Sequence, residues 1–373
     1  MNLWKTKLPL VKPYYAVKCN PEQWLLTWLA SKGSGFDCAS VREINAVKRI
    51  DKAADIVFAN PCKKREEILS PPVTDVNVTV VDSHEEIDKL NEVGYNKSSY
   101  IRIRVDDCGS EMPFSAKFGA DPHAVHALAS YAKLKGQVIG GISFHVGSGC
   151  REPIQYRNAI EDAHECLNVI KEAGHGDANT IDIGGGFMTE GFHEAAEVIR
   201  TTRYSLPWEI RMIAEPGRFF ASSCQDLFVR VIGKKAAADG KKGWRYTLDE
   251  SLYGQFSCIP FDHARPRWIR VRGEGEERRA STPAVLYGRT CDSVDFIAAA
   301  DEAEELMEGD WLWFPHMGAY TTVTSTEFNG FPKPPTIVVE DDVAHGLPDP
   351  AHFPASDWPQ GLKYVSAVKV PDI

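Results

Sequence analysis

A regular alternation of short apolar runs and helical segments between Tyr14 and Ala214 constrains the fold of this chain more than any other feature. Eight runs rich in apolar and β-branched residues predict strands at 14–17, 35–37, 56–59, 78–81, 101–105, 141–145, 181–183 and 211–214. The segments between them have helical character, at 21–31, 41–51, 63–69, 84–93, 122–135, 153–173 and 190–203. Such alternation gives a parallel sheet, either doubly wound or closed, and eight strand–helix units suit a (β/α)8 barrel.

The chain changes character after about residue 226. Runs of β-forming residues at 227–232, 244–248, 283–287, 311–314 and 336–339 are separated by turns and predict an all-β domain, either a sandwich or a barrel. The stretch 264–281 is dense in Arg and Glu and predicts a solvated loop. We therefore expect a barrel domain over 1–225, a β-domain over 226–340 and an irregular, Pro-rich tail over 341–373.

Charge and cysteine content narrow the function. Lys and Arg total 42 against 52 Asp and Glu, and this net charge of -10 argues against nucleic acid or acidic membranes as partners. No apolar run is long enough to cross a membrane, and the first residues do not resemble a signal peptide. The nine cysteines are scattered and never spaced as a metal-binding or redox pair, so we expect reduced thiols, no metal site and a cytoplasmic protein.

Reactive residues follow the ends of several predicted strands, and in a parallel barrel all of these ends face one mouth. Lys18 follows the first strand, Asp37 closes the second and His145 closes the sixth. A lysine at this place suits a Schiff base, because desolvation lowers the pKa of the amine and exposes its neutral, nucleophilic form. Taken alone, a solvated lysine is the commoner alternative.

Glycines after the seventh strand predict a phosphate site, because bare backbone amides can approach an anion closely. Gly184, Gly185 and Gly186 follow that strand, and the run 214–218 (AEPGR) follows the next one. Barrel enzymes often build a phosphate site from these two loops. The alternative is a turn that needs a positive φ.

Three polar side chains near these loops could bind an aromatic, phosphorylated cofactor. Glu215 could keep a pyridine nitrogen protonated, or it could form an ion pair with Arg218. His145 could stack on a flat ring while Ser148 donates to a phosphate, although a hydrogen-bonded core histidine is the commoner case.

In the β-domain, Cys291 and Asp292 join a thiol to a carboxylate in a turn-rich stretch. A buried structural cysteine is the alternative. Tyr320 offers a phenol that belongs either to the core or to a ligand site.

A series of motifs then resembles the eukaryotic-type ornithine decarboxylases. They are PYYAVKCN, GFDCAS, FANPCK, FHVGSGC, DIGGGF, AEPGRFF, YGQFSC, FDHA, CDSVD, GDW, GAYT and FNGF, in family order between about Pro13 and Phe331. The resemblance implies the alanine-racemase-like fold of pyridoxal 5'-phosphate enzymes, in which a (β/α)8 barrel precedes a β-domain. It also implies a head-to-tail homodimer.

Matched by position, the resemblance implies roles for individual residues. Lys18 would bind the cofactor covalently, Glu215 would bind its pyridine nitrogen and His145 would stack on its ring. The residues that would bind the phosphate are Ser148, Gly185, Gly186, Gly217, Arg218 and Tyr320. Those that match positions close to the cofactor and its lysine are Asp37, Glu43 and Arg102.

The same matching assigns the substrate side of the site. Asp262 and Asp292 match two carboxylates that hold the distal amine of the substrate, and Cys291 matches the residue that protonates the carbanion after carbon dioxide leaves. Cys291 and Asp292 would be donated across the dimer interface. Asp262 stands where arginine-using relatives can carry Glu, which favours a short diamino acid.

We therefore expect decarboxylation of L-ornithine to putrescine and carbon dioxide, in polyamine or related amine biosynthesis. One alternative within the same chemistry is lysine or a specialised amino acid of secondary metabolism. The other is a truncated or non-catalytic regulatory homologue.

Three departures from the family pattern bear on these expectations. Only 17 residues precede Lys18, so we expect the family's N-terminal strand and first barrel helix to be missing and part of the barrel wall to be uncovered. Met188 replaces the proline of GGGFP, and the family's GPTCDG is changed at Arg289 and Ser293. We expect Arg289 to alter substrate choice or the conformation of its loop.

Overall fold

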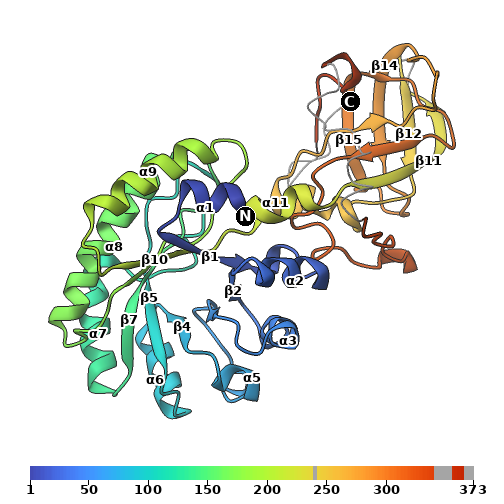
Figure 1. Ribbon diagram of the computed structural model, residues 1–373. Helices are drawn as coiled ribbons and strands as arrows, with labels where there is room; N and C mark the ends of the chain where they lie inside the picture. Colours follow the sequence, from blue (N-terminus) through green and yellow to red (C-terminus); the bar gives the residue numbers. More distant parts are fainter. Residues whose placement is uncertain (238–241, 340–354, 365–373) are drawn as a thin grey trace. The chain divides into compact units, whose positions relative to one another are not determined.

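The chain folds into two compact units, Met1–Phe220 and Ala221–Ile373. The computed structural model describes residues 1–237, 242–339 and 355–364 (Figure 1). Most of the predicted tail, 341–373, lies outside the described residues. The expected limits at 225/226 and 340/341 stay predictions.

The first unit is the predicted barrel of eight parallel strands. Its strands close in the order β1-β10-β9-β7-β5-β4-β3-β2. The strands are β1 (Val11–Ala16), β2 (Gly35–Cys38), β3 (Ile56–Phe58), β4 (Val78–Val81), β5 (Ser98–Arg102), β7 (Val138–Ser143), β9 (Thr180–Asp182) and β10 (Arg211–Ala214). A short antiparallel pair, β6 (Ser110–Met112) with β8 (Ser148–Cys150), was not predicted, because each strand has only three residues.

Helices cover the outside of the barrel, as the alternation predicts (Figure 1). They are α2 (Gln23–Ser31), α3 (Val41–Ile50), α4 (Arg65–Ile68), α5 (Pro71–Thr74), α6 (His84–Glu92), α7 (Val125–Leu134), α8 (Ile154–Glu172) and α9 (Phe192–Ser205), with 3-10 turns η1 (Val17–Cys19) and η2 (Pro122–Ala124). Local sequence sets some of their beginnings. Ser40 and Ser83 accept the N–H groups of Glu43 and Glu86, and these caps start α3 and α6.

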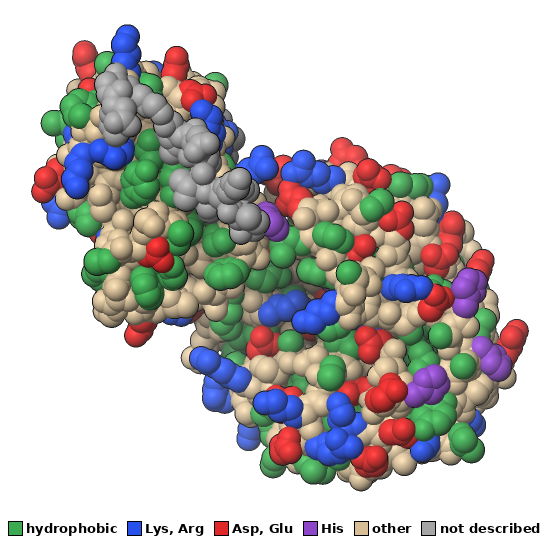
Figure 2. Space-filling view, turned by 180° about the vertical axis from the view of Figure 1, so that it is seen from behind, with side chains coloured by type: hydrophobic (Ala, Val, Ile, Leu, Met, Phe, Trp, Pro, Cys, Tyr) green, Lys and Arg blue, Asp and Glu red, His purple; other side chains and the backbone are tan. Residues whose placement is uncertain are grey.

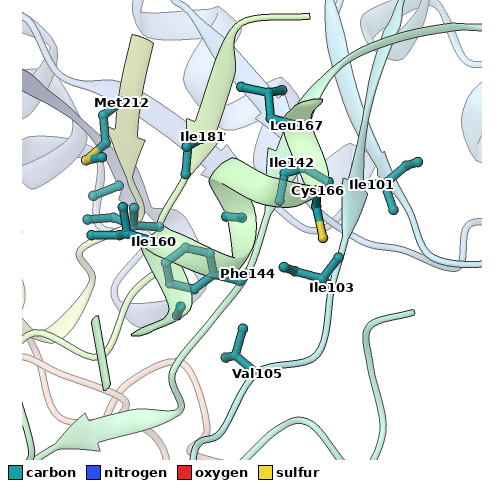
Figure 3. Close-up of a cluster of buried hydrophobic side chains, with 14 of the residues drawn as sticks. Ile101, Ile103, Val105, Ile142, Phe144, Ile160, Cys166, Leu167, Ile181 and Met212 are labelled. Atoms are coloured by element: carbon teal, nitrogen blue, oxygen red, sulfur yellow. The ribbon is translucent and has the colours of Figure 1, made fainter. Parts of the chain in front are cut away.

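Branched apolar side chains of the strands pack against the covering helices. Ile101, Ile142 and Ile181 lie on three strands, are fully buried and belong to the same apolar cluster as Ile160 and Leu167 of α8 (Figure 3). This layer holds the strands in register, and the strand ends can therefore carry polar residues at fixed positions.

A short helix of six residues, α1 (Asn2–Lys7), precedes β1. Trp4 of this helix is fully buried. Its indole N–H donates to the carbonyl of Val11 at 2.9 Å, and its ring centroid lies 4.9 Å from that of Phe187 and 5.7 Å from that of Phe192. The barrel wall is therefore covered at this place.

The second unit is a curled, mixed β-sheet of order β13-β16-β11-β12-β14-β15. Its strands are β11 (Leu227–Ala236), β12 (Trp244–Leu248), β13 (Ile269–Arg270), β14 (Ser281–Tyr287), β15 (Phe296–Glu304) and β16 (Trp311–Phe314). Its helical segments are η3 (Ser222–Cys224), η4 (Gln255–Ser257), α11 (Cys258–Asp262), η5 (Phe328–Gly330) and η7 (Ala355–Asp357), and α10 (Arg218–Ala221) connects the two units along the chain. The pairing of β12 with β14 is parallel, and the other recorded pairs of this sheet are antiparallel.

Two expectations for this unit are wrong. Residues 336–339 form no strand, and Ile337 and Val338 are exposed there. The stretch 264–281 is only partly a solvated loop, because Arg270 within it is buried and paired with Glu304 and Glu276. Strand β15 was missed because its AAADEAE segment has residues that are rare in strands.

Within the described ranges, no helix is both long and apolar enough to span a membrane. On the face shown in Figure 2, acidic and basic side chains are interspersed and not gathered by sign.

Replacing Trp4 by alanine should lower the free energy of unfolding by about 3 to 5 kcal/mol, because the change removes a fully buried indole and its hydrogen bond. Urea unfolding measures this directly. Leu3→Ala on the same helix is the control, since Leu3 is 40% exposed and its loss should cost within about 0.5 kcal/mol. Equal losses in the two variants would contradict the packing role of Trp4.

Candidate active site

Lys18 lies in the turn η1 directly after β1, and its amine meets the carboxylate of Asp37. Strand pairing causes this contact, because Ala16 lies beside Asp37 in the register of β1 and β2. The Asp37 side chain is fully buried, whereas that of Lys18 is 42% exposed, and the ammonium forms an ion pair with Asp37 Oδ2. A buried carboxylate strongly favours a nearby cation, so Asp37 fixes the lysine amine at the end of the strand.

The glycine loop after β9 needs glycine for two reasons. Gly184 and Gly186 have positive φ angles of 62° and 98°, which other residues rarely adopt. A Cβ at Gly185 would lie 2.8 Å from His145 Nε2. The turn with a positive φ, which was the alternative weighed from the sequence, is thus present, and the phosphate site stays a prediction.

His145 follows β7 and has a fixed tautomer. Its Nδ1 accepts the N–H of Gly147 at 2.9 Å, so the ring proton of the neutral form lies on Nε2. The ring packs edge-on against Phe114, with centroids 4.9 Å apart. Burial lowers the pKa of His145 well below its usual value, and the charges of Arg102 and Lys18 lower it further. At neutral pH the imidazole is therefore uncharged, which suits stacking on a flat ring.

Asp182 and Glu215 form a pair of buried carboxyl groups at the ends of β9 and β10. Their side chains share a hydrogen bond, and Asp182 Oδ1 also accepts the N–H of Gly184 at 3.0 Å. Burial raises the pKa of Asp182 to about 7, although the hydrogen bonds from Gly184 and with Glu215 lower it. Burial raises the pKa of Glu215 well above its usual value, and the charge of Asp182 and the hydrogen bond with it raise the pKa further. Two buried carboxyl groups that share a hydrogen bond disfavour a second negative charge, so the pair retains a proton at neutral pH.

Arg218 and Ser148 bring the loops after β7 and β10 together. The guanidinium of Arg218 donates to Ser148 Oγ at 3.3 Å. Gly217, just before Arg218, packs against the turn of Lys18, because a Cβ there would lie 3.0 Å from Cys19 Cβ. An arginine, a hydroxyl group and glycine backbone thus lie together where the loops after β7 and β10 meet. This is the usual composition of a phosphate site.

Arg102 and Glu43 complete the polar surroundings of the barrel mouth. Arg102 ends β5. Burial lowers the pKa of its guanidinium, and the nearby charges of Glu215, Asp37 and Asp182 raise it. Glu43 Oε2 accepts the N–H of Ala39 at 2.6 Å and closes the loop after β2.

The remaining predicted residues belong to the second unit. Cys291 is exposed, and its backbone N–H donates to Asn329 Oδ1 at 3.0 Å. Asp292 accepts a hydrogen bond from the hydroxyl of Tyr253, which lowers the pKa of its carboxyl group. Asp262 is buried at the end of α11, and Tyr320 has a positive φ of 54°.

The structure gathers the barrel residues at one mouth, but it does so through some residues that the sequence analysis missed. Asp182 was not singled out as a functional residue, although it stands at a strand end directly before the three glycines, and that position was a usable signal. Tyr253 and Asn329 were also missed, because their contacts with the 291–292 loop join segments far apart in sequence.

The barrel mouth fits pyridoxal 5'-phosphate, the cofactor that the resemblance implies. It holds a lysine amine, a neutral imidazole face, a carboxyl pair with one proton and a glycine-rich anion site with an arginine. Asp37 Oδ1 and Asp182 Oδ2 are buried and accept no hydrogen bond from a donor in the described residues. Such a donor set matches an aldehyde, a flat ring, a ring nitrogen and a phosphate.

Comparison with known proteins gives a consistent result. Residues 1–222 match the family model of the pyridoxal-dependent decarboxylase pyridoxal binding domain. The chain is 38% identical to an ornithine decarboxylase of Caenorhabditis elegans, with 94% of this chain and 87% of that protein covered. It is also 38% identical to antizyme inhibitor 2 of Xenopus laevis, with 88% and 75% covered.

Solved structures show the same fold. An arginine decarboxylase of Paramecium bursaria Chlorella virus, bound to agmatine, superposes with a TM-score of 0.82 at 37% identity and covers 88% of this chain and 90% of its own. A lysine/ornithine decarboxylase of Vibrio vulnificus, complexed with putrescine, has a TM-score of 0.78 at 30% identity, with 89% and 88% covered. These proteins differ in substrate while sharing the architecture.

Asp182→Asn should weaken the pH dependence of stability in the cofactor-free protein. Asp182 has an ordinary pKa of 3.8 and a folded pKa of about 7, so between these values the folded state binds more protons than the unfolded state. Stability of the wild type should therefore fall as pH rises from about 4 toward about 7, and asparagine should remove part of this fall. Urea unfolding over this pH range measures the effect.

Asp75→Asn is the matched control, because the Asp75 side chain is 78% exposed. That variant should keep the wild-type dependence on pH. An unchanged pH dependence in Asp182→Asn would contradict a proton shared with Glu215.

Proposed function

The chain belongs to the pyridoxal-dependent decarboxylase family, and on this premise we propose that it removes the α-carboxylate of L-ornithine and releases putrescine and carbon dioxide. The arrangement that carries the proposal is the barrel mouth, where the Lys18–Asp37 ion pair, the Asp182–Glu215 pair and the Arg218–Ser148 contact lie at strand ends. This combination serves an amino acid decarboxylase better than it serves a structural core.

The barrel residues would hold the cofactor by its opposite ends. Lys18 would bind it covalently, and Ser148, Gly185, Gly186, Gly217 and Arg218 would hold its phosphate, with Tyr320 from the second unit. When bound, pyridoxal phosphate supplies an electron-accepting ring that draws electrons from the bond to the departing carboxylate. Asp37 and Arg102 would set the charge around the lysine.

Glu215 would form a hydrogen bond with the ring nitrogen of the cofactor, and His145 would stack on the cofactor ring. Because Asp182 and Glu215 share one proton, Glu215 can present a hydrogen bond toward a ring nitrogen at neutral pH. His145 stays neutral and oriented through its bond from Gly147, so it can face an aromatic ring without adding charge.

Two carboxylates would select a diamino acid. Asp262 and Asp292 are proposed to bind the distal ammonium of the substrate, and the hydroxyl of Tyr253 keeps Asp292 ionised. Relatives named as arginine or lysine/ornithine decarboxylases share the fold. Selection for substrate length must therefore come from side-chain contacts such as those of Asp262 and Asp292 with the distal ammonium. The 38% identity to an ornithine decarboxylase supports ornithine over lysine.

Cys291 would return a proton after carbon dioxide leaves. We propose that Cys291 and Asp292 reach the site of a second copy, so that a cytoplasmic homodimer has two shared sites. A regulatory, non-catalytic homologue is the second possibility that similarity allows, given the antizyme inhibitor relative. The presence of Lys18, Glu215 and Cys291 together favours a catalyst.

Lys18→Ala should lower carbon dioxide release from L-ornithine by about a thousandfold or more, because the covalent attachment of the cofactor is lost. Lys12→Ala is the matched control, since Lys12 lies on β1, directly before the turn of Lys18, and pairs with the exposed Asp55. The assay runs L-lysine and L-arginine in parallel with added pyridoxal phosphate. Release mainly from lysine or arginine would contradict ornithine as substrate, and no release at all would contradict decarboxylation.

A mixture of Lys18→Ala and Cys291→Ala chains tests the shared site. Each variant alone should be strongly impaired, whereas random assortment gives hybrid dimers with one intact site and about a quarter of wild-type activity. The mixture is assayed after reversible dissociation. If the mixture gains nothing over the separate variants, Cys291 does not act across the dimer.

A further inference from the structure

The loop that carries Cys291 and Asp292 contacts a second segment, Phe328 to Pro332, at several points. Asn329 accepts the Cys291 N–H, and the ring of Phe328 stacks on Tyr253 with centroids 4.3 Å apart. Tyr253 in turn donates its hydroxyl proton to Asp292. The reactive pair is thus held from outside its own loop, through residues 328 and 329.

Asn329 has a backbone conformation that needs support. Its φ is 59°, and Gly330 follows with φ of 75°. A left-handed asparagine costs free energy unless neighbouring contacts fix it. The Phe328 ring contacts Tyr253 on one side of the turn, and a second contact follows Gly330.

Arg289 supplies that contact. Its guanidinium carbon lies 4.3 Å from the ring centroid of Phe331, and its Nη2 donates to the carbonyl of Pro332 at 3.3 Å. Its charge also lowers the pKa of the buried carboxyl group of Glu250. Arg289 stands two residues before Cys291, at a position where the family pattern has proline, so the side chain links both segments.

We propose that Arg289 is a positioning residue, a latch that fixes the 328–332 turn against the 289–292 loop and so sets the positions of the Cys291 thiol and the Asp292 carboxylate. The inference rests on the proposed function for its catalytic meaning, but the latch itself is a property of the second unit. A proline restrains only its own backbone, whereas this arginine restrains a segment distant in sequence.

Backbone hydrogen exchange of the full-length protein tests the latch without reference to activity. Arg289→Ala should make the amide of Cys291 and the peptide 328–333 exchange about three- to tenfold faster, because local opening becomes easier. Arg289→Lys should lie between the wild type and alanine, since a cation over the Phe331 ring is kept while the planar fork is lost. Arg267→Ala is the matched control, because Arg267 stacks on Trp358 at 4.5 Å elsewhere in the same unit.

Phe331→Leu gives an independent variant that keeps most of the side-chain bulk of this half-buried residue. It should reproduce the faster exchange of Arg289→Ala, and the double variant should add little to either single change. Three results would overturn the latch. The first is an unchanged exchange rate in Arg289→Ala, and the second is an equal increase in exchange at Cys291 and 328–333 in Arg267→Ala. The third is full additivity of the two changes in the double variant.

Kinetics then test its catalytic meaning. With L-ornithine, Arg289→Ala should lower kcat/KM about tenfold, with kcat falling and KM rising together, and Arg289→Lys should recover much of the loss. Normal kinetics in a variant whose loop exchanges faster would overturn the positioning role. If the wild type does not act on ornithine, the proposed function fails, while the exchange experiment still decides on the latch.

Discussion

The pairing of β1 with β2 on one side and with β10 on the other is the interaction on which the site depends. This pairing closes the barrel, and the register places Ala16 beside Asp37. On the opposite side, the N–H of Ala16 donates to the carbonyl of Pro216, which brings the loop of Glu215 and Arg218 to the turn of Lys18. Because β1 is paired on both edges, it places Lys18 beside both its counter-ion, Asp37, and the loop that follows β10.

Charge balance at the barrel mouth explains why one proton must be stored there. The groups whose charges act on one another there include two cations, Lys18 and Arg102, and three carboxyl groups, Asp37, Asp182 and Glu215. Asp37 pairs with Lys18, so the excess falls on the two fully buried carboxyls that share a hydrogen bond. The low polarity of the interior makes a second buried anion costly, and a shared proton removes that cost.

Much of the fold could be predicted from the sequence, because the barrel strands are short, β-branched and separated by helical periods. Strand β15 escaped because alanine and glutamate give no strand signal, and its place is set by pairing with β14. The exposed segment 336–339 has strand-forming residues but no recorded partner strand. At the site, strand ends and glycines identified the barrel residues, whereas the roles of Asp182, Tyr253 and Asn329 depend on long-range contacts that no local pattern contains.

The central claim is that the barrel mouth binds pyridoxal phosphate through the amine of Lys18. Borohydride reduction of the cofactor-loaded protein, followed by peptide mass spectrometry, tests it most directly, because reduction makes the attachment permanent and maps it to one residue. A pyridoxyl group should appear on the peptide that contains Lys18. A group attached to another lysine, or none in protein saturated with the cofactor, would contradict it.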